Sequence, residues 1–191
     1  MNRRHFIVLA LGVLLASACS RAGGDSSGES AGNSSQGLGP TLSTPSLFSY
    51  VAPKGWSSQV GPGGAMGGFP QAVGPASHNF TPDITFKTDG YQTVAQFVKT
   101  YQPKLVDVDQ PFPMKLVDEE PFVTAAGVQG MRLHSIDVAN PPTAEQFSYV
   151  FPNPDGLVFE FACACAPADA AHDAPIFDAS MKTVMILRPG G

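Results

Sequence analysis

Residues 147–165 read FSYVFPNPDGLVFEFACAC, and this stretch decides the fold. Phe147, Tyr149 and Phe151 are alternate residues, so in a strand their side chains lie on one face. Asn153–Gly156 is a turn signal, and the alternation resumes after it. The side chains that share a face in the second strand are Leu157, Phe159, Phe161, Cys163 and Cys165. Two such strands joined by a short turn predict an antiparallel hairpin with one apolar face.

Further strands and two helices are predicted around this hairpin. The strands are Leu47–Val51, Asp83–Lys87, Met114–Val117 and Val128–Val138. In the last strand the alternation is poor, which indicates a bulge or an ambiguous register. One helix is predicted from its Thr93 cap to about Pro103, and another from an Asp173 cap with Pro175 in its first turn. Gly61–Ser77 is rich in glycine and proline and predicts a long surface loop. The pattern predicts an α+β domain in which helices flank an antiparallel sheet.

The N-terminal segment predicts export and lipid attachment. Arg3 and Arg4 precede an apolar run over residues 6–18, which is shorter than the roughly 20 residues of a membrane-spanning helix and is typical of a signal peptide. The run ends in LASAC, which resembles the bacterial lipobox. Residues 1–18 are therefore predicted to be removed, and Cys19 to carry the lipid. The paired arginines also resemble a twin-arginine motif, so general and twin-arginine export both stay open.

The remaining chain divides into a tether and one domain. Residues 19–45 are rich in Gly and Ser and poor in apolar residues, so they predict a disordered tether before a domain at residues 46–189. The predicted location is the bacterial cell envelope, with the protein held to a membrane by its lipid. Ser20 resembles an outer-membrane address, which would place the protein on the periplasmic face of that membrane in a cell with two membranes.

Charge excludes one class of partner. The chain has 11 Lys and Arg residues against 16 Asp and Glu residues, a formal net charge of -5. Removal of residues 1–18 would make the charge -7, because two arginines are lost. No basic field is present to hold phosphate backbones, so nucleic acid is not expected as a partner.

Cys163 and Cys165 are the sharpest local feature. On a regular strand alternate residues are about 6.6 Å apart, whereas the Cβ atoms of a disulfide are about 3.8 Å apart, so a bridge would need a bulge or kink. The pair is either a redox or soft-metal site, aided by His172 or a methionine, or two small core residues, or a strained disulfide.

Other polar residues give weaker signals. The histidines His78, His134 and His172 form no ligand-spaced pair. The acidic residues Asp107, Asp109, Asp118, Glu119 and Glu120 lack the spacing of a calcium loop and predict a solvated acidic surface. No nucleophile elbow or phosphate-binding loop occurs in the domain, so ATP use and esterase chemistry have no residues to rest on. No catalytic residue, metal or cofactor is predicted. Trp56 and Phe69, next to and within the glycine-rich loop, are the candidate binding surface. A buried core position for Trp56 is the alternative.

Several motifs together carry a family resemblance. They are Pro53-Lys54-Gly55-Trp56, Phe80–Ile84, the predicted helix from Thr93, Gly127 before a strand, the hairpin that ends at Cys165, and Phe177-Asp178-x-Ser180. In this order they resemble the PsbP and Mog1 superfamily over Leu47–Leu187, particularly its DcrB-like and LpqN-like lipoprotein branches. The resemblance implies an α/β/α sandwich and non-enzymatic work, and it brings no catalytic residues.

The function predicted from the sequence is binding. The chain is expected to be an envelope lipoprotein that binds or helps to assemble an envelope protein or complex. A thiol-redox or soft-metal-handling protein that uses Cys163 and Cys165 is the first alternative. A carrier that holds a small ligand in the cleft between sheet and helices is the second.

Overall fold

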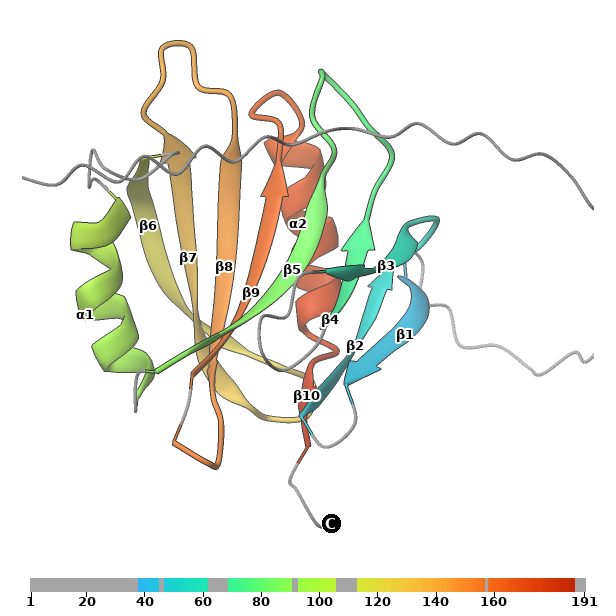
Figure 1. Cartoon of the computed structure of the whole chain (residues 1–191), viewed down its shortest axis with the longest axis vertical. Coiled ribbons are helices and arrows are strands. Elements are labelled where there is room, and N and C mark those ends of the chain that lie inside the picture. The colour runs from blue at the N-terminus through green and yellow to red at the C-terminus, as the bar shows by residue number, and fades with distance from the viewer. Residues whose placement is uncertain are drawn as a thin grey trace, which may run out of the picture. The chain divides into compact units, whose positions relative to one another are not determined.

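The computed structural model describes residues 38–44, 47–61, 69–90, 93–105, 113–156 and 158–187, with the backbone alone at residues 89 and 101–105. In chain order the elements are β1 (Leu38–Thr44), β2 (Phe48–Pro53), β3 (Ser57–Gly61), β4 (Phe69–Val73), β5 (Asp83–Asp89), α1 (Val94–Leu105), β6 (Met114–Val123), β7 (Gln129–Asp137), β8 (Glu145–Pro152), β9 (Val158–Cys165), α2 (Ala170–Met181) and β10 (Met185–Ile186). The strands form two antiparallel sheets (Figure 1). A seven-stranded sheet has the order β3-β4-β5-β9-β8-β7-β6, and a three-stranded sheet has the order β1-β2-β10.

The predicted hairpin is confirmed as β8 and β9, which lie in the middle of the seven-stranded sheet. Tyr149 lies opposite Phe161, and Phe151 lies opposite Phe159, all four with buried side chains. Gly156 closes the turn with a φ of 78°, a conformation that side chains with a Cβ rarely adopt. The apolar face that the alternation predicts is therefore the main core-forming surface of the sheet.

Different elements cover the two faces of the seven-stranded sheet. On one face Phe161 packs in a cluster with Phe177 of α2 and Phe48 of β2. On the opposite face Val158 packs with Phe97 of α1. The order is therefore helix α1, the large sheet, and then a layer of α2 and the small sheet (Figure 1). This arrangement confirms the predicted antiparallel sheet flanked by helices.

The two helices differ in how well the sequence predicts their starts. α1 begins as expected, because the Thr93 hydroxyl accepts a hydrogen bond from the Gln96 amide at 3.1 Å. The predicted start of α2 at Asp173 is wrong, since Asp169 is the N-cap and the helix begins at Ala170. Pro175 lies inside α2 on an exposed side, where water can satisfy the carbonyl that loses its partner. Within the described ranges, no helix has the length and apolar character that crossing a bilayer requires.

Two segments predicted to be irregular are strands. Residues 38–44 belong to the predicted tether, but they form β1, in which Leu42 lies opposite Tyr50 of β2 and is buried. The backbone of β2 supplies hydrogen bonds that the Gly- and Ser-rich composition does not reveal. Residues 69–73 belong to the predicted loop, but they form β4 between β3 and β5. Residues 1–37, with the predicted signal peptide, Cys19 and most of the tether, lie outside the described residues.

An irregular register was predicted for the Val128–Val138 strand, which is β7, but the irregularity lies in the neighbouring strand β6. β7 is regular against β8, whereas the pairing of β6 with β7 shifts between Leu116 and Asp118. β6 also continues well beyond the predicted end at Val117. The shift sets which β6 side chains face the α2 layer, because each one-residue slip reverses the face.

Candidate functional site

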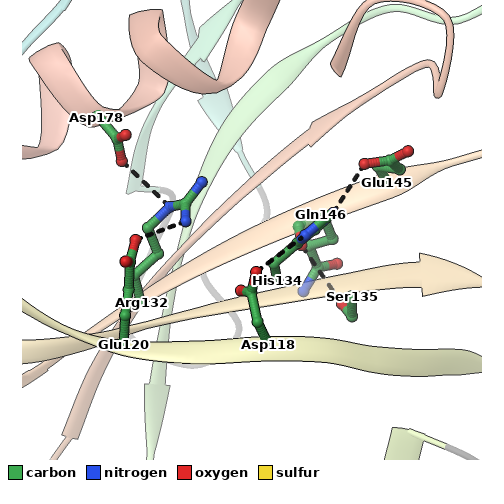
Figure 2. Close-up of polar contacts among 8 residues, drawn as sticks. All are labelled: Asp118, Glu120, Arg132, His134, Ser135, Glu145, Gln146 and Asp178. Atoms are coloured by element: carbon green, nitrogen blue, oxygen red, sulfur yellow. Dashed lines mark hydrogen bonds and ion pairs between the residues drawn. The ribbon is translucent and has the colours of Figure 1, made fainter. Parts of the chain in front are cut away.

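Six charged or titratable side chains gather on the sheet face that carries α2, on its β6 side (Figure 2). We call them the charged platform: Asp118, Glu120, Arg132, His134, Glu145 and Asp178. They come from β6, β7, β8 and α2, and the strand pairing places Asp118 opposite His134 and Glu120 opposite Arg132. α2 packs over β8 and β9, and its Asp178 also reaches Arg132 of β7. Farther toward the sheet edge, Asp118 and Glu120 of β6 are exposed on this face.

Arg132 holds one half of the platform together. Its Nη1 donates a hydrogen bond to Glu120 Oε1 at 2.7 Å, and its Nε forms an ion pair with Asp178 Oδ1 at 3.2 Å. The Tyr149 hydroxyl donates to the same Asp178 oxygen at 2.6 Å, and burial raises the pKa of Tyr149 far above its ordinary value, so this donor stays protonated. Burial opposes the charge on Arg132, but Tyr149, Asp178 and Glu120 outweigh it and raise the pKa of Arg132.

His134 holds the other half. Its Nε2 lies 2.8 Å from Glu145 Oε2, and its Nδ1 lies 3.9 Å from Asp118 Oδ2. The imidazole stacks on the Phe147 ring, with centroids 4.5 Å apart and planes 13° apart. The Arg132 guanidinium carbon lies 4.8 Å from the centroid of the same ring. The guanidinium of Arg132 and the imidazole of His134 therefore cover the Phe147 ring, which is only 3% exposed.

The platform carries an excess of negative charge. Its four carboxylates face one guanidinium and one imidazole, and the outermost carboxylates, Asp118 and Glu120, have side chains 57% and 56% exposed. Arg132 and Glu145, in contrast, are largely buried. The accessible charge of the platform is therefore acidic, which suits a basic surface of another molecule.

A groove of about 1020 Å³ opens at one end of the sheet. Three loops gather at this end, namely β4–β5, β7–β8 and β9–α2 (Figure 1). The apolar part of its lining is Phe80, Met114, Pro141, Pro142, Ala144, Ala164, Ala166, Pro167 and Ala168. His78 and Asn79, both at positive φ, form the two-residue turn of a small hairpin that Ser77 and Phe80 close. The groove adjoins the platform, because Glu145 belongs to both.

Asp83 is one of the carboxylates that line this groove. Gln71 Nε2 donates to Asp83 Oδ2 at 2.7 Å. Burial raises the pKa of Asp83, against the opposing effects of the Gln71 hydrogen bond and the charge on Lys87. Among the described residues, none donates a hydrogen bond to the other oxygen, Oδ1.

The cysteine pair is part of the core. Cys163 and Cys165 are alternate residues of β9, and both are buried free thiols. Burial raises the pKa of Cys163 well above its ordinary value and that of Cys165 to about 12, so both resist forming the thiolate that metals and redox partners need. His172 is 78% exposed, and its Nδ1 lies 2.9 Å from Asp173 Oδ1. No group of three or more His, Cys, Asp and Glu side chains that could hold a metal ion occurs in the part of the chain that the structure describes.

These thiols make the stability of the protein fall at alkaline pH. The thiol pKa is about 9 when unperturbed and higher in the folded protein, so the unfolded chain loses its protons first. The contribution of the two protonated thiols to the free energy of unfolding is therefore fully present below pH 9 and is lost as the pH rises through 9 toward 12. Each thiol adds up to about 1.4 kcal/mol per pH unit to this decline. Urea unfolding at pH 8 to 10.5 measures this decline. The Cys163→Ala plus Cys165→Ala variant should show a shallower slope, and equal slopes would contradict the assignment.

The candidate binding surface at Trp56 and Phe69 is not an exposed patch. Phe69 is only 7% exposed and belongs to the core, so its prediction as a binding residue is wrong. The Trp56 ring packs edge-on against Phe177 with centroids 5.9 Å apart. A Cβ at Gly74 would lie 2.7 Å from Trp56 Cε2, so the indole rests directly on the backbone there. Trp56 is thus a partly buried core residue, the alternative that the sequence left open.

The other sequence candidates are scattered. His78 contacts Asp169 at 3.1 Å on the groove rim, whereas His134 lies in the platform. Asp118 and Glu120 of the predicted acidic surface join the platform, Glu119 lies on the opposite face of β6, and Asp107 and Asp109 fall outside the described residues. Sequence reasoning missed Arg132, Glu145 and Asp178. Arg132 and His134 are alternate residues of a predicted strand, so the sequence alone could have indicated that their side chains share one face.

The fold and the layer order define the class of the protein, an α+β domain with an antiparallel sheet between helices. No protein-family model matches the sequence, and no curated protein matches it. The solution structure of cyanobacterial PsbP (CyanoP) from Synechocystis sp. PCC 6803 matches 83% of this chain and 98% of that chain, with a TM-score of 0.58 and 14% identity. The crystal structure of LpqN, a protein involved in cell envelope biogenesis of Mycobacterium tuberculosis, matches 73% of this chain and 83% of that chain, with a TM-score of 0.50 and 16% identity. These matches confirm the PsbP-like fold that the sequence resemblance implies.

Proposed function

We propose that this chain is a lipid-anchored protein of the bacterial cell envelope that binds a protein partner and supports its assembly without catalysing a reaction. The partner contact in this proposal is the charged platform. The single observation that carries the proposal is the excess of carboxylates on the platform, two of which, Asp118 and Glu120, are more than half exposed.

The location in this proposal rests on the N-terminal sequence. The lipobox-like LASAC segment supports lipid attachment at Cys19, and the short apolar run before it supports export. LpqN, which has a similar fold, is involved in cell envelope biogenesis, and the proposal extends that setting to this chain. With residues 1–18 removed the protein is acidic, so the lipid alone would hold it to a membrane.

The partner in this proposal presents a basic surface. Asp118 and Glu120 project most of their carboxylates into water, whereas Arg132 and Phe147 beneath them are ordered by contacts within the domain. A preformed acidic surface favours encounter with lysine and arginine side chains. Binding then costs little side-chain entropy on this side of the contact, because few side chains have to be immobilised. Such an interaction weakens as salt is added, which separates it from a purely apolar contact.

Reversing one charge on the platform is expected to weaken partner capture about tenfold. The full lipidated chain with Asp118→Lys is compared with the unchanged protein by affinity capture from mildly crosslinked membranes, followed by mass spectrometry. A basic partner surface then meets a lysine in place of a carboxylate, and like charges at a contact repel.

Glu119→Lys is the matched control for this experiment. It makes the same charge change in the same strand, but its side chain lies on the opposite face of the sheet. The chain with Cys19→Ala tests the lipid anchor in the same assay, because it should lose the envelope partner altogether. Equal capture by the Asp118→Lys and Glu119→Lys variants would refute the platform as the contact, and capture that survives Cys19→Ala would refute the anchor.

A further inference from the structure

The groove at the loop end of the sheet has the size and lining of a small-molecule site. Its volume of about 1020 Å³ is at the upper end of the range for such pockets. Prolines and alanines from the β7–β8 and β9–α2 loops form its walls, with Phe80 and Met114. These side chains offer an apolar body contact but no hydrogen bonds, so the polar groups in the groove decide which ligands fit.

The titratable groups of the groove are mostly carboxylates, and Asn79, Thr143 and Gln146 are its neutral polar side chains. Asp83, Asp137 and Glu145 line it, and His78 is the one basic side chain among the described lining residues. Asp137 has both oxygens hydrogen-bonded, and Glu145 uses Oε2 in its contact with the His134 imidazole. The donors to Asp137 are the Thr143 hydroxyl and the Thr143 and Ala139 amides.

Asp83 differs from Glu145 in its partner, because Asp83 is bound by the neutral Gln71 amide whereas Glu145 pairs with an imidazole. Gln71 donates to Asp83 Oδ2, and Oδ1 receives no hydrogen bond from the residues described around it. His78, the basic residue on the rim, is held by Asp169 and by the Ser77 hydroxyl. A partly buried carboxylate with one open oxygen, next to apolar walls, complements a ligand that has an apolar body and a positively charged donor group.

We propose that this groove binds a small organic amine, with its apolar body against the proline and alanine walls and its ammonium group at the Asp83 carboxylate. This site adjoins the platform at Glu145, but its ammonium contact is Asp83, which is no part of the platform, and it does not rest on the proposed function. The ammonium donates to the open Oδ1, while the Gln71 hydrogen bond holds the carboxylate in position. Phe80, at the same rim, offers an aromatic surface to the ligand.

Three probes with one phenyl ring and different head groups test the proposal. Phenethylamine, phenethyl alcohol and hydrocinnamate are titrated into the full chain carrying Cys19→Ala, and the amide NMR signals of Ala164, Ala166 and Ala168 are followed. Phenethylamine is expected to bind at least tenfold more tightly than hydrocinnamate, with the alcohol between them. Asp83→Asn should lower the affinity for the amine about tenfold and change that for the alcohol less than twofold, because the amide keeps the shape and can still accept from Gln71.

Asp155→Asn is the control for charge in general. Asp155 lies in the β8–β9 turn, at the opposite end of the strands from the groove, and its loss makes the same change in net charge. The order of the three probes should therefore survive in this variant. The proposal is overturned if no probe moves the three alanine signals, if all three probes bind equally, or if Asp83→Asn leaves the affinity for the amine unchanged.

Discussion

Replacing Phe161 with alanine is expected to lower the free energy of unfolding by about 3 to 5 kcal/mol. The Phe161 side chain is fully buried at the centre of the large sheet. Its ring contacts the rings of Phe48, Tyr50, Phe86 and Phe151, with centroid distances of 5.0, 5.7, 5.2 and 6.0 Å. Removing it opens a cavity where three strands and the small sheet meet, and rings held on all sides cannot collapse into the space. Urea unfolding followed by the fluorescence of Trp56, the one tryptophan of the chain, measures the loss.

Val60→Ala is the control for this substitution. Val60 also lies in a strand of the large sheet, but its side chain is 79% exposed. Its truncation is expected to change stability by less than about 0.5 kcal/mol. A loss of less than 1 kcal/mol for Phe161→Ala would mean that the aromatic cluster is not the centre of the core.

Adding a single methyl group at Gly130 is expected to cost about 3 kcal/mol. A Cβ there would lie 2.3 Å from the Val150 carbonyl oxygen and 2.6 Å from Phe151 Cδ1. The first of these atoms belongs to the backbone of β8, so the neighbouring strand would have to move. Gly130→Ala should therefore lower the unfolding midpoint in urea without altering the far-ultraviolet circular dichroism of the folded state.

Gly90→Ala serves as the comparison for Gly130→Ala. A Cβ at Gly90 meets no atom within 4 Å, and the residue is exposed. This variant is expected to be as stable as the unchanged protein, or slightly more stable because alanine restricts the unfolded chain. If both glycine variants lost the same stability, the close approach of β7 and β8 at Gly130 would be disproved.

The parts of the fold that were predictable from sequence are those with a local signal. Alternating aromatic residues identified β8 and β9, and a cap with an apolar stripe identified α1, because both patterns follow from the period of the element itself. β1 and β4 were not predicted, because their sequences carry no such local pattern. Their sequences are short and rich in glycine, proline or polar residues, and they are strands because β2, β3 and β5 supply hydrogen bonds from elsewhere in the chain.

The candidate sites were less predictable than the fold. Asp118, Glu120 and His134 were visible as an acidic run and a lone histidine, but Arg132 and Asp178 meet only because β7 lies beside the C-terminal helix. The register shift in β6 also decides that Asp118 and Glu120, rather than Glu119, face this way. The groove is made by three loops that are distant in sequence, and no local pattern reports their meeting.

The end of the large sheet at β6 has a consequence for copies of the protein held close together. β6 is an edge strand, and an open edge is a template on which another chain can add a strand and begin to aggregate. Here the shift beside Val117 interrupts the ladder, Pro121 lacks an amide hydrogen, and Asp118, Glu119 and Glu120 place like charges in a row. If β6 of a second copy came alongside, the same acidic residues of the two copies would repel each other. Copies of the protein concentrated on one surface would therefore leave this edge unpaired.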